Sequence, residues 1–209
     1  MATKYETMFT PIGKIRYLFV NGRHDTFTYN GQIQDSGYTA TLVLEDKDAR
    51  KLKEELINKF KETQEFKDFV EEYDSEPNEI NVGLRKKKNK DGKWEWLFKA
   101  KTVAEWNNKD GTTTEHVIPL YDGQNNRLDD KTQVWSGSKG RLYIMLKPYK
   151  TPAGMIGFSP KLNAVQITEL VTNTASTKPA GSPFDTVDGS SAIAYQSVEE
   201  SQNESNIPF

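Results

Sequence analysis

The chain of 209 residues contains no cysteine and only two histidines, His24 and His116. The lack of cysteine excludes a disulfide-stapled module and a cysteine-ligated zinc site. Two histidines far apart in the sequence cannot form a histidine metal centre, so we expect no metal and no cofactor. Apolar runs such as residues 17–20 are far too short for a membrane helix, which needs about 20 residues. The first residues lack an apolar targeting core, which predicts a protein of the reducing cytoplasm.

Charge is nearly balanced overall, with 28 basic and 30 acidic residues, but it is unevenly distributed. Residues 45–76 hold seven basic and twelve acidic side chains, whereas residues 81–109 hold nine basic and three acidic ones. Residues 139–161 contain five basic residues and no acidic residue. Because a charged partner responds to local potential rather than to the total, these two basic stretches are more informative than the net charge of -2.

Short segments rich in aromatic and β-branched residues, bounded by Gly and Asn, predict strands. Turns are indicated at Asp91-Gly92 and at residues 107–111. There is no internal repeat, and strands do not alternate with helices as a parallel α/β sheet requires. The predicted strands are 15–20, 38–44, one beginning at Trp94, 115–121, 141–149 and 163–171.

Apolar residues recur at spacings of three and four between Asp46 and Tyr73, with Lys and Glu between them. This spacing predicts one amphipathic helix or two in succession, with Asp46 or Asp48 as the N-cap and Pro77 beyond the end. We therefore expect a mainly β fold, a small closed or partly closed barrel with a helical insertion. Residues 1–172 form this domain, and the Ser, Thr, Gly, Pro and acid composition of 173–209 predicts a disordered tail.

Residues 141–149 combine cations with flat rings on one strand face. Alternation places Leu142, Ile144 and Leu146 on the core face. The opposite face holds Arg141, Tyr143, Lys147 and Tyr149, with Lys139 and Lys150 flanking it. Lysine and arginine can hold phosphates while rings stack on bases. An ordinary amphipathic strand with an exposed polar face would show the same alternation.

A second basic region repeats this combination between residues 86 and 106. Lys99 and Lys101 share the strand face opposite Phe98, which makes them candidate phosphate contacts. The tryptophans have the parity of Phe98, so we expect at least one of them to pack in the core. The candidates in this region are Lys86, Lys87, Lys88, Trp94, Trp96, Lys99, Lys101 and Trp106.

The last residues form an apolar tip on an acidic tether. The acids could compete for the basic groove, or the tip could enter a hydrophobic pocket of a partner protein. A remnant without a role is the alternative. The residues concerned are Glu199, Glu200, Glu204, Ile207, Pro208 and Phe209.

Seven short segments, in this order and spacing, resemble the single-stranded-DNA-binding proteins of short-tailed bacteriophages. The resemblance implies a five-stranded OB-fold barrel with a helical insertion and an acidic C-terminal tail. It also implies a base-stacking role for Tyr149 and phosphate contacts for Lys99, Lys101 and Arg141. The matching segments are 41–44, 98–101, 110–112, 118–120, 138–141, 146–150 and 167–170.

The resemblance implies a non-enzymatic protein of the infected host's cytoplasm that coats single-stranded DNA during replication, recombination and repair. Its tail would recruit the polymerase and the helicase or primase. Family members form dimers, although no interface is evident in the sequence. The tip Ile207-Pro208-Phe209 departs from the family pattern and is similar to that of bacterial single-stranded-DNA-binding proteins.

Two other functions remain as alternatives to DNA coating. A metal-dependent nuclease could use acid pairs such as Asp129-Asp130 or Glu71-Glu72 as ligands. These pairs fall in a polar turn and on a helix surface, and no phosphate-binding loop is present. An RNA-binding OB module is the other alternative, because stacking on rings does not distinguish the two sugars.

Overall fold

Five long strands of the computed structural model, which describes residues 5–171, form a closed mixed barrel. The ring runs β2-β4-β7-β12-β11 and returns to β2. Neighbours are antiparallel except β7 and β12, which run parallel and meet at Lys101 and Lys161. This is the predicted OB-fold barrel. Its strands are β2 (Gly13–Phe19), β4 (Gln32–Leu44), β7 (Trp94–Thr102), β11 (Lys139–Lys150) and β12 (Ile156–Glu169).

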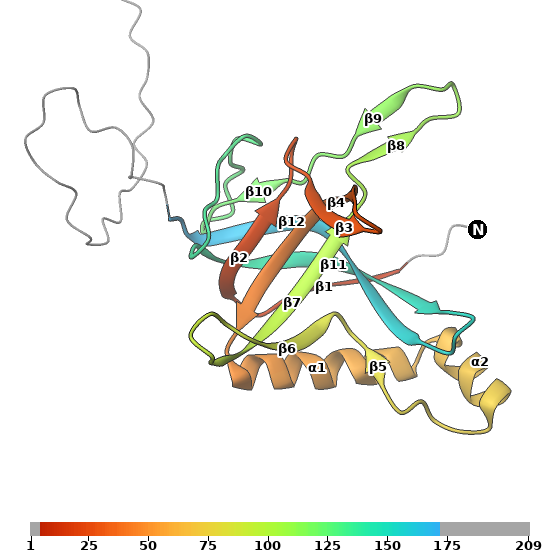
Figure 1. The fold of residues 1–209 in the computed structure, drawn as a ribbon. Coiled ribbons are helices and arrows are strands. Elements are labelled where there is room, and N and C mark those ends of the chain that lie inside the picture. The colour runs from red at the N-terminus through yellow and green to blue at the C-terminus, as the bar shows by residue number, and fades with distance from the viewer. Residues whose placement is uncertain (1–4, 172–209) are drawn as a thin grey trace, which may run out of the picture. The chain divides into compact units, whose positions relative to one another are not determined.

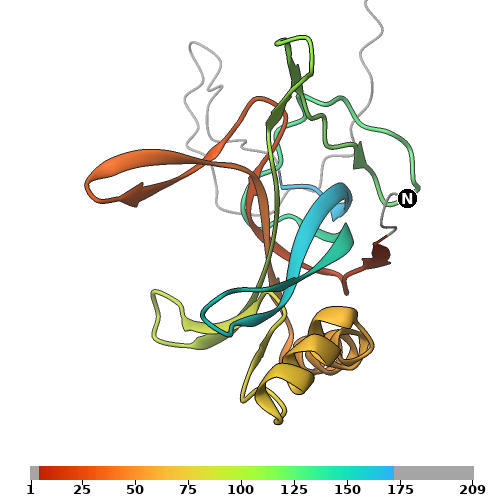
Figure 2. The ribbon, with the colours of Figure 1, turned by 90° about the vertical axis from the view of Figure 1, so that its right-hand side faces the viewer.

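Shorter strands extend the barrel or project from it. β1 (Glu6–Phe9) pairs with β11, and β3 (Asp25–Tyr29) forms a projecting hairpin with β4. Figure 2 shows this hairpin and the β6–β7 hairpin extending toward the same side. The remaining strands are β5 (Ile80–Asn81), β6 (Leu84–Lys88), β8 (Glu105–Asn107), β9 (Thr113–Glu115) and β10 (Leu120–Tyr121). The predicted tail and its tip lie outside the described residues.

Two helices, α1 (Asp46–Lys61) and α2 (Gln64–Tyr73), connect β4 to the strands that follow and lie together beneath the barrel (Figure 1). The apolar spacing predicted this pair. Thr63 caps α2 by accepting a hydrogen bond from the Phe66 amide, and α2 ends at Asp74, which has a left-handed backbone. Neither described helix is long and apolar enough to cross a membrane.

The N-cap prediction for α1 was wrong. Glu45 occupies the N-cap position without a side-chain cap, and Asp46 lies inside the first turn. There its carboxylate accepts hydrogen bonds from Arg50 and from the Trp96 indole, so the side chain fixes tertiary structure instead of capping. An acid in the first turn still interacts favourably with the helix dipole.

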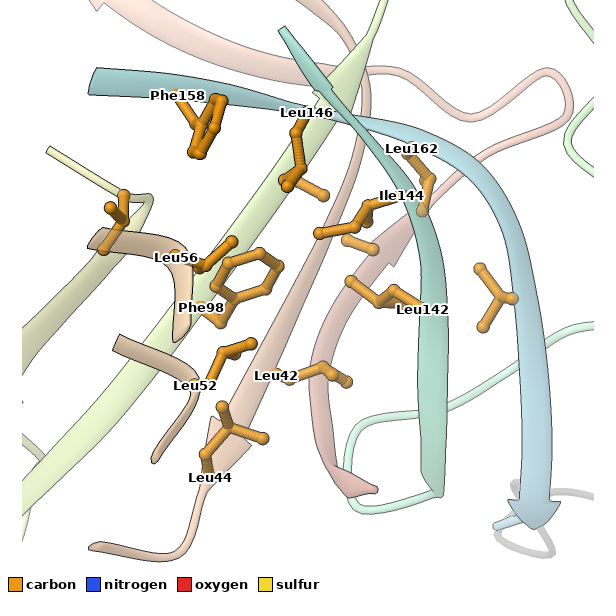
Figure 3. Packing of buried hydrophobic residues seen from close by; sticks show 14 of the residues in the cluster. Leu42, Leu44, Leu52, Leu56, Phe98, Leu142, Ile144, Leu146, Phe158 and Leu162 are labelled. Atoms are coloured by element: carbon orange, nitrogen blue, oxygen red, sulfur yellow. The ribbon is translucent and has the colours of Figure 1, made fainter. Parts of the chain in front are cut away.

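The barrel core consists of alternate strand residues together with one face of α1. Figure 3 shows Leu52 and Leu56 beside Phe98, with Leu42 and Ile144 nearby. Phe98 and Leu56 have no exposed surface. Burial of a side chain of this size contributes about 1.5–3 kcal/mol, so this contact between helix and strand anchors α1 beneath the barrel.

The predicted strand 115–121 was wrong in its middle. Pro119 cannot donate a ladder hydrogen bond, and the segment divides into β9, a connection and β10. The predicted turn at Asp91-Gly92 is present, and the basic residues before it belong to a strand. Residues 84–88 form β6, and the turn with Gly92 at a φ of 77° follows. That turn joins β6 to β7, so the basic segment lies on a hairpin.

A bulge changes the alternation of β2. The register with β4 shifts between Ile15 and Tyr17. As a result Ile15, Leu18 and Val20 are buried, whereas Tyr17 points outward and is 55% exposed. Unbroken alternation would place Tyr17 on the same face as Ile15.

Candidate functional site

A groove of about 1120 Å³ lies between β7 and the β11–β12 hairpin. Lys99 and Lys101 reach it from β7, Lys147 and Tyr149 from β11, and Lys161 from β12. The positions follow from strand alternation, because the neighbours of these residues, such as Ala100 and Leu146, point into the core. One concave surface therefore collects four lysines and a tyrosine ring.

Two smaller hollows extend the groove at its ends. One of about 190 Å³ shares Arg85 and Lys99 with it, and the other of about 380 Å³ shares Lys101 and Lys161. Because neighbouring hollows share lining residues, the three form one continuous trough. From here on, the word groove means this whole trough and not only its central hollow. Its lining adds Arg16, Tyr17, Phe19 and Lys87 at one end and His24, Asp35 and Glu105 at the other.

Aromatic rings line one end of the groove and its central hollow. At the end, Tyr17 and Phe19 lie nearly parallel, with ring centroids 6.2 Å apart and an interplanar angle of 21°. In the central hollow, Tyr149 is half-buried. The groove thus combines rings with lysines, and this combination lets bases stack while cations hold the backbone.

The lysines of the groove differ in their partners. Lys99 donates to Asp25 at 2.8 Å, and Thr39 donates to the same carboxylate at 3.0 Å. Burial alone would raise the pKa of Asp25, but these hydrogen bonds outweigh burial and lower it. Asp25 is therefore a charged group inside the groove that neutralises part of the potential of Lys99.

Lys101, Lys147 and Lys161 form no ion pair with any side chain among residues 5–171. Lys101 and Lys161 are direct neighbours where β7 meets β12. Like charges placed opposite each other on neighbouring strands repel. No described acid offsets this pair by an ion pair, so an anion between them would relieve the repulsion.

The structure brings together five of the predicted site residues, Lys87, Lys99, Lys101, Lys147 and Tyr149. Arg141 and Tyr143 do not join them. The Arg141 guanidinium lies 4.8 Å from the ring centroid of Phe9, and the Phe9 and Tyr143 rings are 4.9 Å apart. We call these three residues the β1 patch. Alternation puts Arg141 and Tyr149 on one strand face, but Phe9 of β1 lies against Arg141, whereas Tyr149 lines the groove.

The other predicted candidates lie away from the groove. Lys139 pairs with Glu169 at 3.0 Å, and Lys150 pairs with Glu72 of α2. Trp106 is 45% exposed on the β8–β9 hairpin and contacts His116 edge to face. Trp96 packs against the core, as expected for at least one tryptophan. Lys86, Lys88 and Trp94 lie on the β6–β7 hairpin.

Sequence reasoning missed five residues that line the groove. Tyr17 and Phe19 were missed because the bulge in β2 reverses their parity. Lys161 was missed because the strand was predicted to begin at residue 163, whereas β12 already begins at Ile156 and continues through Pro160. Arg85 and Arg16 could have been found from charge alone, although nothing in their neighbourhood shows which way they face.

No cluster of three or more His, Asp or Glu side chains that could hold a metal ion occurs within residues 5–171. Of the acid pairs considered above, Asp130 binds Arg127 at 3.0 Å and Asp129 accepts a hydrogen bond from the Lys131 amide. Glu72 is occupied by Lys150. Three of these four carboxylates thus have a partner within the fold.

The barrel described above also occurs in a solved protein structure. It is similar to the crystal structure of gp2.5, a single-stranded DNA binding protein encoded by bacteriophage T7, with a TM-score of 0.56 and 22% identity. This likeness covers 84% of the present chain and 97% of that one. No protein-family model and no curated protein matches the sequence.

A second solved structure is the single-stranded DNA-binding protein from bacteriophage Enc34 in complex with ssDNA. Its TM-score is 0.48 and its identity is 9%, over 77% of this chain and 85% of that chain. The match to gp2.5 establishes the fold and confirms, at that level, the resemblance seen in the sequence.

Proposed function

We propose that this chain binds single-stranded DNA in the groove, without strong sequence preference, as part of phage DNA replication and recombination. The observation that carries the proposal is the adjacent pair Lys101 and Lys161, which has no ion-pair partner in the described chain and lines the same hollow as Tyr149. The fold supports it, because the structure similar to this one is a phage protein of that activity.

The chemistry of the groove suits an unpaired strand. Each base that stacks on a ring contributes about 1–3 kcal/mol whichever base it is. Each phosphate that meets a lysine releases counterions, so that affinity falls as salt rises. Because every base has a flat face, stacking on a ring favours binding without strong sequence preference. Coating, rather than reaction, is the function that such a surface supports.

Fluorescence anisotropy of a labelled oligo-dT tests this proposal. The variant K101A/K161A removes the lysine pair, and K51A/K131A removes two exposed lysines that line no part of the groove. Each lysine–phosphate contact raises affinity about fivefold at about 0.1 M salt relative to 1 M salt. Because the first variant loses two such contacts, we expect it to bind roughly 25-fold more weakly at about 0.1 M salt. The second should bind like the wild type. Equal loss in both variants would contradict the groove as the binding site.

The same titration separates the remaining functions. Oligo-dT should bind more tightly than a duplex of equal length, because bases buried in a stack cannot reach the rings. Oligo-U of the same length distinguishes an RNA-binding module. Incubation of the oligonucleotide with Mg²⁺ detects cleavage, and we expect none. Preference for duplex DNA, or magnesium-dependent cleavage, would overturn the proposal.

We also propose that the acidic C-terminal segment recruits replication proteins, among them the polymerase and the helicase or primase. The support is in the sequence, where residues 173–209 hold five acids, one lysine and the apolar ending Ile207-Pro208-Phe209. Deleting 207–209 should leave affinity for DNA intact and abolish recruitment of these proteins in a pull-down. Deleting 173–209 should tighten DNA binding if the acids compete for the groove. Unchanged recruitment after the first deletion would refute this role.

A further inference from the structure

The two faces of the β6–β7 hairpin have different surroundings. Direct cross-strand pairs place Lys86 opposite Trp96 and Lys88 opposite Trp94. Residues that face each other directly across an antiparallel pair share one face of the sheet. The alternate residues, Arg85 and Lys87 of β6, therefore lie on the other face, and both line the groove. We call the face of Lys86, Lys88, Trp94 and Trp96 the rear face.

Lysine side chains cover both tryptophan rings of the rear face. Lys88 Nζ lies 5.3 Å from the centroid of Trp94, and Lys86 Nζ lies 4.9 Å from that of Trp96. The two rings differ in freedom. Trp96 is half-buried, and its indole nitrogen donates to Asp46 at 2.8 Å, whereas Trp94 is 63% exposed. A ring this large and this exposed is available to a ligand.

Only the edge of β6 separates the rear face from the groove. Within the described chain β6 pairs with β7 alone, so its outer edge carries no neighbouring strand. The segment along this edge and around the turn is the most basic of the chain, with Arg85, Lys86, Lys87, Lys88, Lys90 and Lys93 against Asp91. All seven side chains are exposed. A phosphate backbone that leaves the groove at Lys87 thus meets cations continuously around the edge.

We propose that single-stranded DNA longer than the groove turns around the edge of β6 and stacks a base on Trp94. Lys88 then holds an adjacent phosphate, while Lys86 stays near Asp46, whose carboxylate lies 3.7 Å from its Nζ. Stacking of a base is stronger than an exposed cation–π contact, so the base displaces Lys88 from the ring and frees its ammonium for the backbone. The Asp46 carboxylate, held by Arg50 and Trp96, repels phosphate and marks the inner limit of this second site.

This inference rests on the proposed function, and its test uses oligonucleotide length to separate the two. Wild type, W94A, W94F and W135A are titrated with an oligo-dT series from about 6 to 30 nucleotides, since OB-fold sites cover about 4–16. Trp135 is 40% exposed and lines no part of the groove, so W135A controls for the loss of an exposed indole. W94F keeps a stacking ring and controls for damage to the hairpin.

We expect W94A to bind the shortest oligonucleotides like the wild type and the longest about tenfold more weakly. W94F and W135A should follow the wild type at every length. Equal affinity of W94A and wild type at all lengths would overturn the second site, as would an equal loss at all lengths or an equal loss in W135A. Failure of the wild type to bind any oligonucleotide would instead refute the proposed function, which makes the two failures distinguishable.

Discussion

A single strand, β11, contributes cations and rings to two surfaces with different properties. Lys147 and Tyr149 line the groove, where Lys147 has no ionic partner among the described residues. Arg141 and Tyr143 lie in the β1 patch, where the Arg141 Nε donates to Gln166 at 2.7 Å and the guanidinium covers Phe9. In the patch, Arg141 Nε and the Tyr143 hydroxyl thus already have partners within the fold.

The difference shows what makes a cation and ring pair available to a ligand. Each of the two pairs consists of one basic residue and one tyrosine, and both follow the same strand alternation. Lys147 and Tyr149 face the groove between β7 and the β11–β12 hairpin. In contrast, β1 lies alongside Arg141 and Tyr143 and supplies Phe9 and Thr7 as their partners. We therefore propose that concavity and unpaired charge, rather than residue type, mark the groove as the binding surface.

The largest expected effect comes from reversing charge in the groove. K101E/K161E should lower the affinity for oligo-dT by roughly 100-fold or more at about 0.1 M salt, because two phosphate contacts are lost and two repulsions are added. The same reversal in K139E/R141E should change affinity no more than about threefold, since screening over about 10 Å weakens a distant charge. A comparable loss in both double variants would erase the distinction between groove and patch.

The rings provide the second comparison. Y149A should weaken binding about tenfold, the loss of one stacked base, whereas Y143A should stay within about twofold of the wild type. Circular dichroism on both variants checks that the barrel is intact. Unchanged affinity of Y149A would remove this ring as a stacking platform, and a larger loss in Y143A would shift the site to the β1 patch.

A smaller effect is expected from the acid inside the groove. D25N removes a negative charge and releases Lys99 for phosphate, which should tighten binding by up to about fivefold, the value of one contact. E169Q releases Lys139 outside the groove in the same way and should have no effect. Weaker binding by D25N would show that Asp25 positions Lys99 rather than competes with the ligand.

The smallest effect concerns stability at low pH. Hydrogen bonds from Arg50 and Trp96 lower the pKa of Asp46 to about 2 from its usual 3.8. A lowered pKa stabilises the fold above pH 3.8, and this contribution disappears as the pH falls toward 2. The urea midpoint of unfolding should therefore change less between pH 7 and pH 3 in D46N than in wild type. An identical pH dependence of the two proteins would show that Asp46 does not stabilise the hairpin against α1.

The sequence was sufficient for the barrel, the helical insertion and the groove residues of β7 and β11. Period-two alternation around Phe98 and Leu146 places Lys99, Lys101 and Lys147 outward, and apolar spacing predicts α1 and α2. Alternation could not place residues beyond an irregularity. The bulge in β2 hid Tyr17, and the lysine run gave no sign that Lys87 and Lys88 lie on opposite faces of a hairpin. Those facts depend on cross-strand register, which long-range pairing decides.

Photocrosslinking tests the central claim most directly. A short oligo-dT carrying 5-iodouracil is irradiated in complex with the full chain, and mass spectrometry maps the attached side chains. The account predicts adducts on Tyr149, Tyr17 or Phe19, which border the groove, and an adduct on Trp94 only with longer strands. Adducts concentrated on Phe9 and Tyr143 would contradict it.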